Sequence, residues 1–237
     1  MGVLILLLGV ELGFLKNNVK KMNAKNRETS YINLAGGDEP KLDIPPETVT
    51  PVLDEMNLMI VAHPDDETLW GGAHLLNDKY YVVCVTCGNV DYRDREFKTI
   101  MEKTQDEYTF LKYPDLVGGH ISNWENDIDN IKNDLDKIIK SRNWKTIVTH
   151  NPEGEYGHFH HKTLSFLVTK LFNDKDRLFY FGKYYADNVP EMPKIGDTVY
   201  NSKINDLVSV YKSQPKAVKR HYHMLQYENF VQYKDWY

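Results

Sequence analysis

Short apolar runs alternate with segments of helical spacing from Pro51 to the end of the chain. Continuous apolar runs are typical of strands that are buried in a sheet. They predict strands over residues 57–62, 80–87, 145–150 and 177–185. Apolar residues that recur three and four positions apart predict helices over residues 67–76, 94–111, 126–142 and 160–172.

This alternation predicts an α/β fold, a Rossmann-like three-layer domain with a mostly parallel sheet. In such sheets the ligand site lies beyond the carboxyl ends of the strands. His63 directly follows the first predicted strand, Thr86 to Asn89 end the second, and His150 ends the third. Polar groups at three strand ends therefore predict one crevice at that edge of the sheet.

The first fifty residues differ from the rest of the chain in composition and lack the alternation of strands and helices. Residues 22–50 are polar and contain Gly36, Gly37 and several prolines, which predicts a linker or an extended arm. Residues 3–15 are apolar, but they are fewer than the about 20 residues that a spanning helix needs, and no basic leading region or clear cleavage site accompanies them. We interpret residues 1–50 as an N-terminal extension and residues 51–237 as the domain that contains the crevice.

Two interpretations of residues 3–15 stay open. They are a membrane-directing segment with lysines behind it, or they are a disordered or misassigned start with Met22 as the initiator. The corresponding locations are membrane-associated on the cytoplasmic side, or cytoplasmic.

Composition and charge narrow the classes of function. The chain has 237 residues, of which 41% are hydrophobic and 12% aromatic, as in an ordinary globular protein. Its formal net charge is −5 and the sequence has no basic block, which argues against nucleic acid as a partner. Cys84 and Cys87 form a C-x-x-C pair, but positions three apart on a strand point to opposite faces. We interpret them as packed thiols.

A histidine and two aspartates follow the first predicted strand in the stretch IVAHPDDE. Pro64 suits the first turn of a helix, because its missing N–H costs nothing there. If the helix begins at this point, His63 and Asp66 lie three positions apart and converge. Imidazole and carboxylate are ligands that suit zinc. Asp65 points in a neighbouring direction and is free to move protons beside the metal.

A second cluster, EYGHFHHKTL, occupies residues 155–164. His158 and His161 are three positions apart and share one face of the predicted helix, whereas His160 is offset from His161 by about 100° and is expected to point elsewhere. Two histidines and one carboxylate, with a fourth position left to water, are typical of a catalytic zinc site. Asp65 would take the proton of that water, and His158 would stabilise an oxyanion or protonate a leaving amine.

Each of these features also has a structural explanation. Adjacent aspartates suit the N-terminus of a helix, and a lone His-x-x-His pair is a weak motif. We interpret the other single histidines as structural: His74, His120, His221 and His223. The functional interpretation rests on both clusters falling at strand-to-helix junctions of one sheet.

The stretches AHPDDE at 62–67 and GHFHH at 157–161 resemble the two signatures of the zinc-dependent sugar N-deacetylase family. That family includes the N-acetylglucosaminyl-phosphatidylinositol de-N-acetylases and the mycothiol-pathway deacetylases. Further stretches resemble its other motifs: TCGN (86–89) with Arg93 and Glu96, YPD (113–115), YKSQ (211–214) and ENF (228–230). The resemblance covers about residues 57–231.

The resemblance implies a role for each matching residue. His63, Asp66 and His161 resemble the ligands of Zn²⁺ or of another divalent metal that replaces it. Asp65 resembles the general base. The catalytic domain would then be residues 51–237.

His158 resembles the electrostatic stabiliser or acid, and Tyr156 a mobile oxyanion donor. Arg93 and Asp115 resemble the substrate-binding groups. One departure concerns His160, because many family members have H-P-D-H where this chain has His-Phe-His-His. The missing aspartate otherwise orients the first histidine, so the departure bears on His158.

We expect a metal-dependent hydrolase that removes the acetyl group from an N-acetylglucosamine-type amino sugar or glycoconjugate and releases acetate. A lipid-linked substrate gains weight if residues 3–15 meet a bilayer. The alternatives are an amide hydrolase of the same fold with a non-sugar substrate, a non-catalytic glycan-binding protein, and a redox or structural-zinc protein that uses Cys84 and Cys87. Asp65 argues against the glycan-binding protein, because binding alone needs no base there.

Overall fold

The computed structural model describes residues 56–195 and 198–237, so the N-terminal extension with residues 3–15 lies outside the described residues. The strands are β1 (Asn57–Val61), β2 (Tyr80–Thr86), β3 (Glu107–Tyr113), β4 (Leu116–Val117), β5 (His120–Ile121), β6 (Ile147–Thr149), β7 (Leu178–Phe181) and β8 (Phe230–Gln232). The helices are α2 (Asp66–Asn77), α3 (Asp91–Thr104), α4 (Ile128–Lys140), α5 (Phe159–Leu171), α6 (Thr198–Val208), α7 (Pro215–His221) and α8 (Tyr233–Trp236), with 3₁₀ turns η1 (Lys175–Arg177) and η2 (Tyr222–Tyr227). Across these described stretches, no helix has the length and hydropathy needed to span a bilayer.

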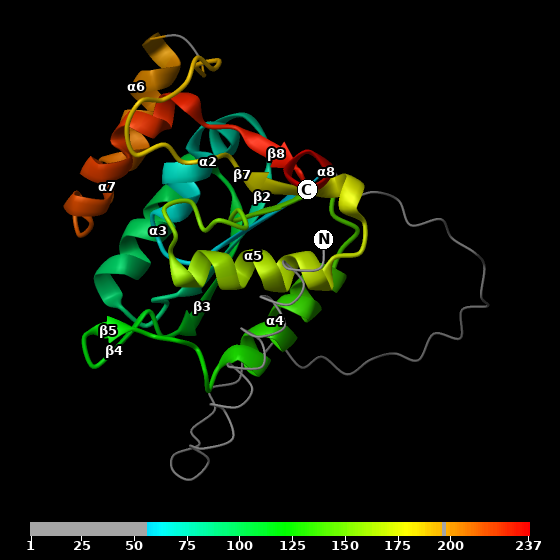
Figure 1. The fold of residues 1–237 in the computed structure, drawn as a ribbon. Helices are drawn as coiled ribbons and strands as arrows, with labels where there is room; N and C mark the ends of the chain where they lie inside the picture. The colour runs from blue at the N-terminus through cyan, green and yellow to red at the C-terminus, as the bar shows by residue number, and fades with distance from the viewer. Residues whose placement is uncertain (1–55, 196–197) are drawn as a thin grey trace. The chain divides into compact units, whose positions relative to one another are not determined.

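Six strands form one sheet in the order β3–β2–β1–β6–β7–β8 (Figure 1). Every neighbouring pair is parallel except β7 and β8. From β1 the chain adds β2 and β3 toward one edge of the sheet, and it then returns to place β6 on the other side of β1. The winding therefore changes direction between β1 and β6, which is where open α/β sheets bind their ligands. The strands β4 and β5 form a separate antiparallel hairpin.

Alternate residues of β1 pack into two different cores. Met59 and Val61 contact side chains of α2, α3 and α6 on one face of the sheet. Leu58 and Ile60 contact side chains of α4 and α5 on the other face. A strand that is covered on both faces has no polar face, which is why its sequence is continuously apolar. The three-layer α/β fold with a mostly parallel sheet is therefore confirmed.

The prediction of one helix over residues 94–111 is wrong in its second half. The helix α3 ends at Thr104, where Gln105 takes a left-handed conformation with φ of 61° and donates its N–H to the carbonyl of Met101. The chain then forms β3, which pairs with β2 in parallel register. Aromatic and β-branched residues at 108–110 suit a strand, and pairing with β2 outweighs the helical spacing.

The last predicted strand, over residues 177–185, is shorter than expected. The strand β7 ends at Phe181, and the next residue, Gly182, donates its N–H to the carbonyl of Asn229 beside β8. The strands β1, β2 and β6 and the helices α2, α4 and α5 lie where the sequence predicts them, with small differences at their ends.

Cys84 and Cys87 are buried free thiols, as predicted. Cys84 belongs to the core on the α2 side of the sheet, and Cys87 follows the end of β2. Burial raises the pKa of both thiols, Cys84 the more strongly, which keeps them protonated and unreactive.

Residues Leu53–Tyr237 form one compact unit, which predicts that the catalytic domain can start at Leu53. A chain shortened to start at Leu53 is expected to fold cooperatively, with the same thermal unfolding midpoint by circular dichroism as the full chain. If the shortened chain is unfolded or insoluble while the full chain is folded, residues 1–52 are part of the domain and the boundary is wrong.

Candidate active site

The turn between β1 and α2 places two aspartates side by side with different orientations. Asp65 has a φ of 116°, an unfavourable value for a residue with a side chain. Its backbone N–H donates to Glu67 Oε2 at 3.1 Å, which helps to hold the turn. Asp66 is the first residue of α2, and its side chain turns back toward His63, whose backbone N–H donates to Asp66 Oδ2 at 2.8 Å.

The three residues predicted to bind a metal converge at this turn. Asp66 Oδ2 lies 3.0 Å from His63 Nδ1 and 3.3 Å from His161 Nε2, and the two ring nitrogens are 3.3 Å apart. Ligands of a tetrahedral zinc ion at 2.0–2.1 Å lie roughly 3.3 Å from one another. The three side chains are buried and combine imidazole with carboxylate, so their chemistry and spacing fit a zinc ion or a similar divalent cation.

Within residues 56–195 and 198–237, three sets of side chains bring candidate ligand atoms within 4.8 Å of one another. They are His63 with His158 and His161, Asp66 with His150 and His161, and His63 with Asp115 and His160. The predicted ligands draw on the first two sets. None of the sets contains a cysteine, which argues against the structural-zinc alternative.

Glu155 determines which nitrogen of His161 faces Asp66. Glu155 Oε2 accepts a hydrogen bond from His161 Nδ1 at 2.5 Å and another from His150 Nδ1 at 3.0 Å. His161 Nε2 is therefore the nitrogen left for a metal, in the carboxylate–histidine–metal arrangement that is common in metalloenzymes. Burial would raise the pKa of Glu155, but its interactions with His150 and His161, which both donate hydrogen bonds to it, lower it to about 2. Sequence reasoning missed Glu155, although it adjoins Tyr156.

His150 follows β6 as predicted, but it does not line the crevice and instead supports the site from the buried interior. Its side chain is fully buried, and its Nε2 accepts the backbone N–H of Ala62 at 3.0 Å. Its Nδ1 donates to Glu155. Both ring nitrogens are thus engaged, which leaves neither of them for a metal.

His158 precedes helix α5 instead of sharing a helical face with His161. The helix begins at Phe159, and His158 is its N-cap, whose Nδ1 accepts the backbone N–H of His160 at 3.2 Å. The neutral ring therefore carries its proton on Nε2. Burial, together with the charge of His63, lowers the pKa of His158 to about 3, so the ring is a neutral donor at neutral pH.

His160 does not point away from the site, and that prediction is wrong. Its Nδ1 lies 2.9 Å from His63 Nε2, and its Nε2 lies 2.6 Å from the carbonyl oxygen of Ser122. His63 follows β1, and its ring lies between Asp66 and His160. Asp66 faces Nδ1 of His63, and His160 contacts Nε2 on the opposite side of the ring.

Asp65 and Arg93 lie together beside the predicted metal ligands. Burial, and then the charge of Asp66, raises the pKa of Asp65 to about 8. Arg93 opposes this shift, since its Nη2 lies 3.9 Å from Asp65 Oδ1 while the same guanidinium donates to the carbonyl of Pro64. A divalent cation next to Asp66 would also favour the ionised form of Asp65. A carboxyl group with a pKa near the working pH suits a general base.

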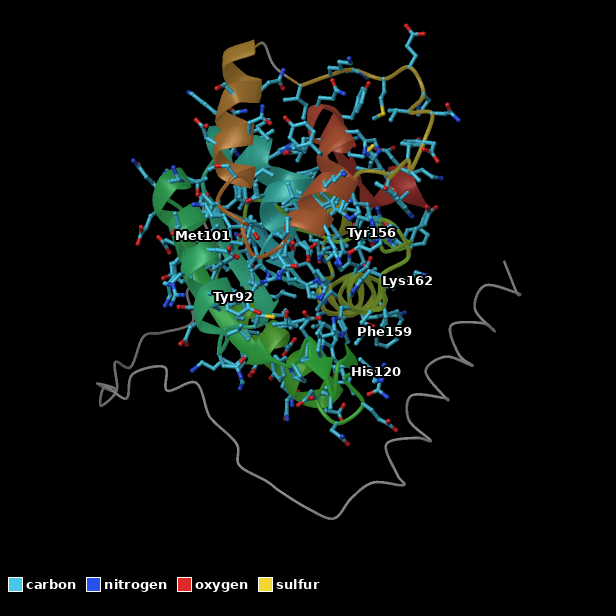
Figure 2. All side chains as sticks on the ribbon, turned by 90° about the vertical axis from the view of Figure 1, so that its left-hand side faces the viewer. Tyr92, Met101, His120, Tyr156, Phe159 and Lys162 are labelled. Carbon is cyan, nitrogen blue, oxygen red and sulfur yellow. The ribbon has the colours of Figure 1, made fainter. Side chains whose placement is uncertain are left out.

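A crevice at this sheet edge collects the predicted site residues. Its lining includes His63, Asp65, Asp66, Arg93, Asp115, Tyr156 and His158, while His161 lies buried beneath. In Figure 2, which faces this side of the molecule, Tyr92 at the start of α3 lies on the left, and Tyr156 and Phe159 near the start of α5 lie on the right. Tyr156 is 38% exposed, and burial of the rest of the ring raises the pKa of its hydroxyl, which stays a donor.

The segment around α7 adds Gln214, Ala217 and His221 to the crevice wall. His221, interpreted as structural from the sequence, is buried and stacks on Tyr156 with ring centroids 4.6 Å apart. No spacing relates these residues to the histidine clusters, so the sequence alone could not place them there.

The buried Glu67 and the half-buried Glu96 hold that segment in position. Tyr211 donates its hydroxyl to Glu67 Oε1 at 2.5 Å. Ser213 donates its N–H and its hydroxyl to Glu96 at 2.8 and 2.5 Å. The C-terminal motif YKSQ is thereby tied to the acids of AHPDDE and of the Arg93–Glu96 motif.

Comparison with known proteins agrees with this geometry. Residues 58–172, which include all the predicted site residues, match the family PIG-L, GlcNAc-PI de-N-acetylase. The chain belongs to the PIG-L family. The resemblance inferred from its motifs is therefore confirmed, and PIG-L membership supports a de-N-acetylase hydrolase that acts on an N-acetylated sugar or glycoconjugate.

Two relatives extend the PIG-L comparison. The uncharacterized protein L374 of Acanthamoeba polyphaga mimivirus is 31% identical over 195 residues, which are 75% of this chain and 80% of the relative. A probable N-acetylglucosaminyl-phosphatidylinositol de-N-acetylase of Schizosaccharomyces pombe is 30% identical over 120 residues, or 45% of this chain. The match spans about half the length of the yeast protein, 48%.

The convergence of His63, Asp66 and His161 predicts the effect of removing a ligand. His63→Ala and His161→Ala are each expected to lose bound zinc while the domain stays folded, because the site lies at the sheet edge. Metal analysis of purified protein should find about one ion per chain in the parent and much less in the variants. His120→Ala, on the exposed β4–β5 hairpin, is the control and should match the parent. Full metal content in both ligand variants would contradict the assignment.

Proposed function

We propose that this protein is a zinc-dependent N-deacetylase that hydrolyses the acetamide of an N-acetylglucosamine-type amino sugar. The observation that carries the proposal is the position of Asp65. It lines the crevice next to the convergent His63, Asp66 and His161, its Oδ1 lies 3.9 Å from Arg93 Nη2, and among the described residues it belongs to none of the three sets of candidate ligand atoms. Metal binding and proton transfer can therefore be divided between two adjacent aspartates.

The chemistry follows from the donors and acceptors around the crevice. His63, Asp66 and His161 would hold a divalent cation, which when bound would supply a Lewis acid for the amide carbonyl and would lower the pKa of the attacking water. Asp65 accepts the proton of that water. His158, through Nε2–H, and Tyr156, through its hydroxyl, donate hydrogen bonds to the oxyanion that forms.

The leaving nitrogen must gain a proton as the C–N bond breaks. His158 is neutral at neutral pH and is a poor general acid, because burial and His63 lower its pKa to about 3. Asp65 holds the proton taken from water and can pass it to the nitrogen. The products are acetate and a free amine.

Arg93 and Asp115 are proposed to bind the sugar. Both line the crevice, and Asp115 keeps 26% of its side chain exposed, so its carboxylate can accept hydrogen bonds from sugar hydroxyls. The yeast relative is named for N-acetylglucosaminyl-phosphatidylinositol, which supports a lipid-linked substrate of that type. Residues 3–15 are the segment proposed to bring the protein to such a substrate at a membrane.

The pair Asp65→Asn and Asp66→Asn separates the two proposed roles. Asp65→Asn keeps the shape of the side chain and removes the base, so turnover should fall by about 10²- to 10⁴-fold with KM little changed. Its zinc content should equal that of the parent. Asp66→Asn removes a ligand charge and should lose zinc and turnover together.

The readouts are acetate release and metal content of the same preparations. If Asp65→Asn keeps full turnover while Asp66→Asn keeps full metal, the two roles are assigned wrongly. If the zinc-loaded parent releases acetate from none of a panel of N-acetylated sugars and glycolipids, the glycan-binding protein replaces the enzyme.

A further inference from the structure

His160 occupies a fixed position behind the proposed metal ligands. Its side chain is fully buried and lies flat on the indole of Trp124, with ring centroids 3.9 Å apart and 3° between the planes. Trp124 is itself fully buried and donates its Nε1–H to the carbonyl of Pro114 at 2.8 Å. The plane of the His160 ring is therefore set from one side by a rigid neighbour.

The contacts of His160 determine where its proton lies. Its Nε2 is 2.6 Å from the carbonyl oxygen of Ser122, which can only accept, so Nε2 carries the hydrogen. The nearest carboxylate oxygen of Asp115 is 3.9 Å from Nδ1, beyond hydrogen-bond distance, so no acid holds a second proton on the ring. A neutral imidazole with its proton on Nε2 has a bare lone pair on Nδ1.

That lone pair faces His63. The distance from His160 Nδ1 to His63 Nε2 is 2.9 Å, so His63 donates its Nε2–H across it. With a proton on Nε2, Nδ1 is the nitrogen of His63 that faces Asp66 and His161. In the metal-free protein Nδ1 donates to Asp66 Oδ2 at 3.0 Å, and a bound cation would take the place of that proton. The chain of hydrogen bonds runs from His63 through His160 to the carbonyl of Ser122.

We propose that His160 is a positioning residue that selects the Nε2–H tautomer of His63 and aims its Nδ1 at the metal. The inference rests on the proposed metal-dependent function. Histidine ligands of metals usually donate their second N–H to a carboxylate or a backbone carbonyl. Here Nδ1 of His160 takes that place, and the backbone carbonyl of Ser122 accepts the Nε2–H of His160.

Asp115 is a second acceptor near His63, and its geometry is weaker. Its Oδ1 lies 3.4 Å from His63 Nε2, and the side chain is 26% exposed, whereas His160 is closer and fully buried. With His160 holding His63, the carboxylate of Asp115 remains available to substrate. This division explains why two acceptors converge on one N–H.

A rival explanation uses the same atoms as ligands. His63, Asp115 and His160 bring ligand atoms within 4.8 Å of one another and could hold a second metal ion. His63 would then have to bind one metal through each nitrogen, which requires loss of its Nε2 proton. The number of metal ions per chain distinguishes this explanation from the positioning role.

The test compares zinc affinity in two variants of His160 in the full chain. His160→Phe keeps a flat ring against Trp124 and removes both nitrogens, so zinc affinity should fall by about 10- to 100-fold. His160→Asn offers an amide oxygen close to the position of Nδ1 and should recover most of that loss. His120→Phe, on the exposed hairpin, is the matched control and should bind zinc like the parent. Competition with a chromophoric chelator measures each affinity.

Nuclear magnetic resonance of ¹⁵N-histidine-labelled parent protein tests the tautomers directly, including the case in which His160→Phe does not fold. The proposal expects Nε2–H on both His160 and His63 in the metal-free protein, and a zinc-induced shift at Nδ1 of His63. A proton on Nδ1 of His160, an affinity of His160→Phe within about twofold of the parent, or two zinc ions per chain would overturn it. If the parent binds no zinc, the proposed function fails, and the metal-free spectrum still decides the tautomer.

Discussion

The buried carboxylate of Asp66 is the interaction on which the rest of the site depends. It lies at the start of α2, where the helix dipole favours negative charge, and it accepts the backbone N–H of His63. Burial alone would raise its pKa, but His161, His150 and His63 hold it well below its ordinary value. A negative charge among imidazoles, at the point where the sheet changes its winding direction, gives this edge the chemistry that a divalent cation would need.

The histidines around Asp66 are held in place through the ring nitrogens that do not face its carboxylate. Glu155, from the loop after β6, fixes His161 through Nδ1, and His160, from α5, contacts His63 at Nε2. The nitrogens that remain, His161 Nε2 and His63 Nδ1, both face Asp66. The same turn leaves the carboxyl of Asp65 on the crevice side, with a pKa raised by burial and by Asp66. One strand end thus provides a ligand set and a candidate base.

The fold was largely predictable because its strands are buried on both faces. The apolar run of β1 reflects two cores, and its end marks the position of His63. The prediction failed at Gln105, where a left-handed residue ends α3 and pairing with β2 decides the conformation of the next segment. The helical spacing of residues 94–111 does not show that their second half pairs with β2.

The convergence of the candidate site residues was predictable where they adjoin a strand end and share a motif. His160 was misjudged because a helical wheel describes only its own helix, whereas the contact with His63 comes from a different strand. Glu155 stands in the same stretch as His161, but it precedes the helix, and only the tertiary structure shows its contacts with His150 and His161. His221 has no spacing relation to the other site residues, and only the tertiary structure brings it to Tyr156.

The central claim is that these residues form a metal-dependent deacetylase site. The most direct measurement is acetate release from N-acetylglucosaminyl-phosphatidylinositol and free N-acetylglucosamine by the parent protein, before and after removal of metal with a chelator, and again after zinc is restored. The account predicts release that disappears with the metal and returns at about one equivalent of zinc per chain. Release that is unchanged by complete metal removal would contradict it.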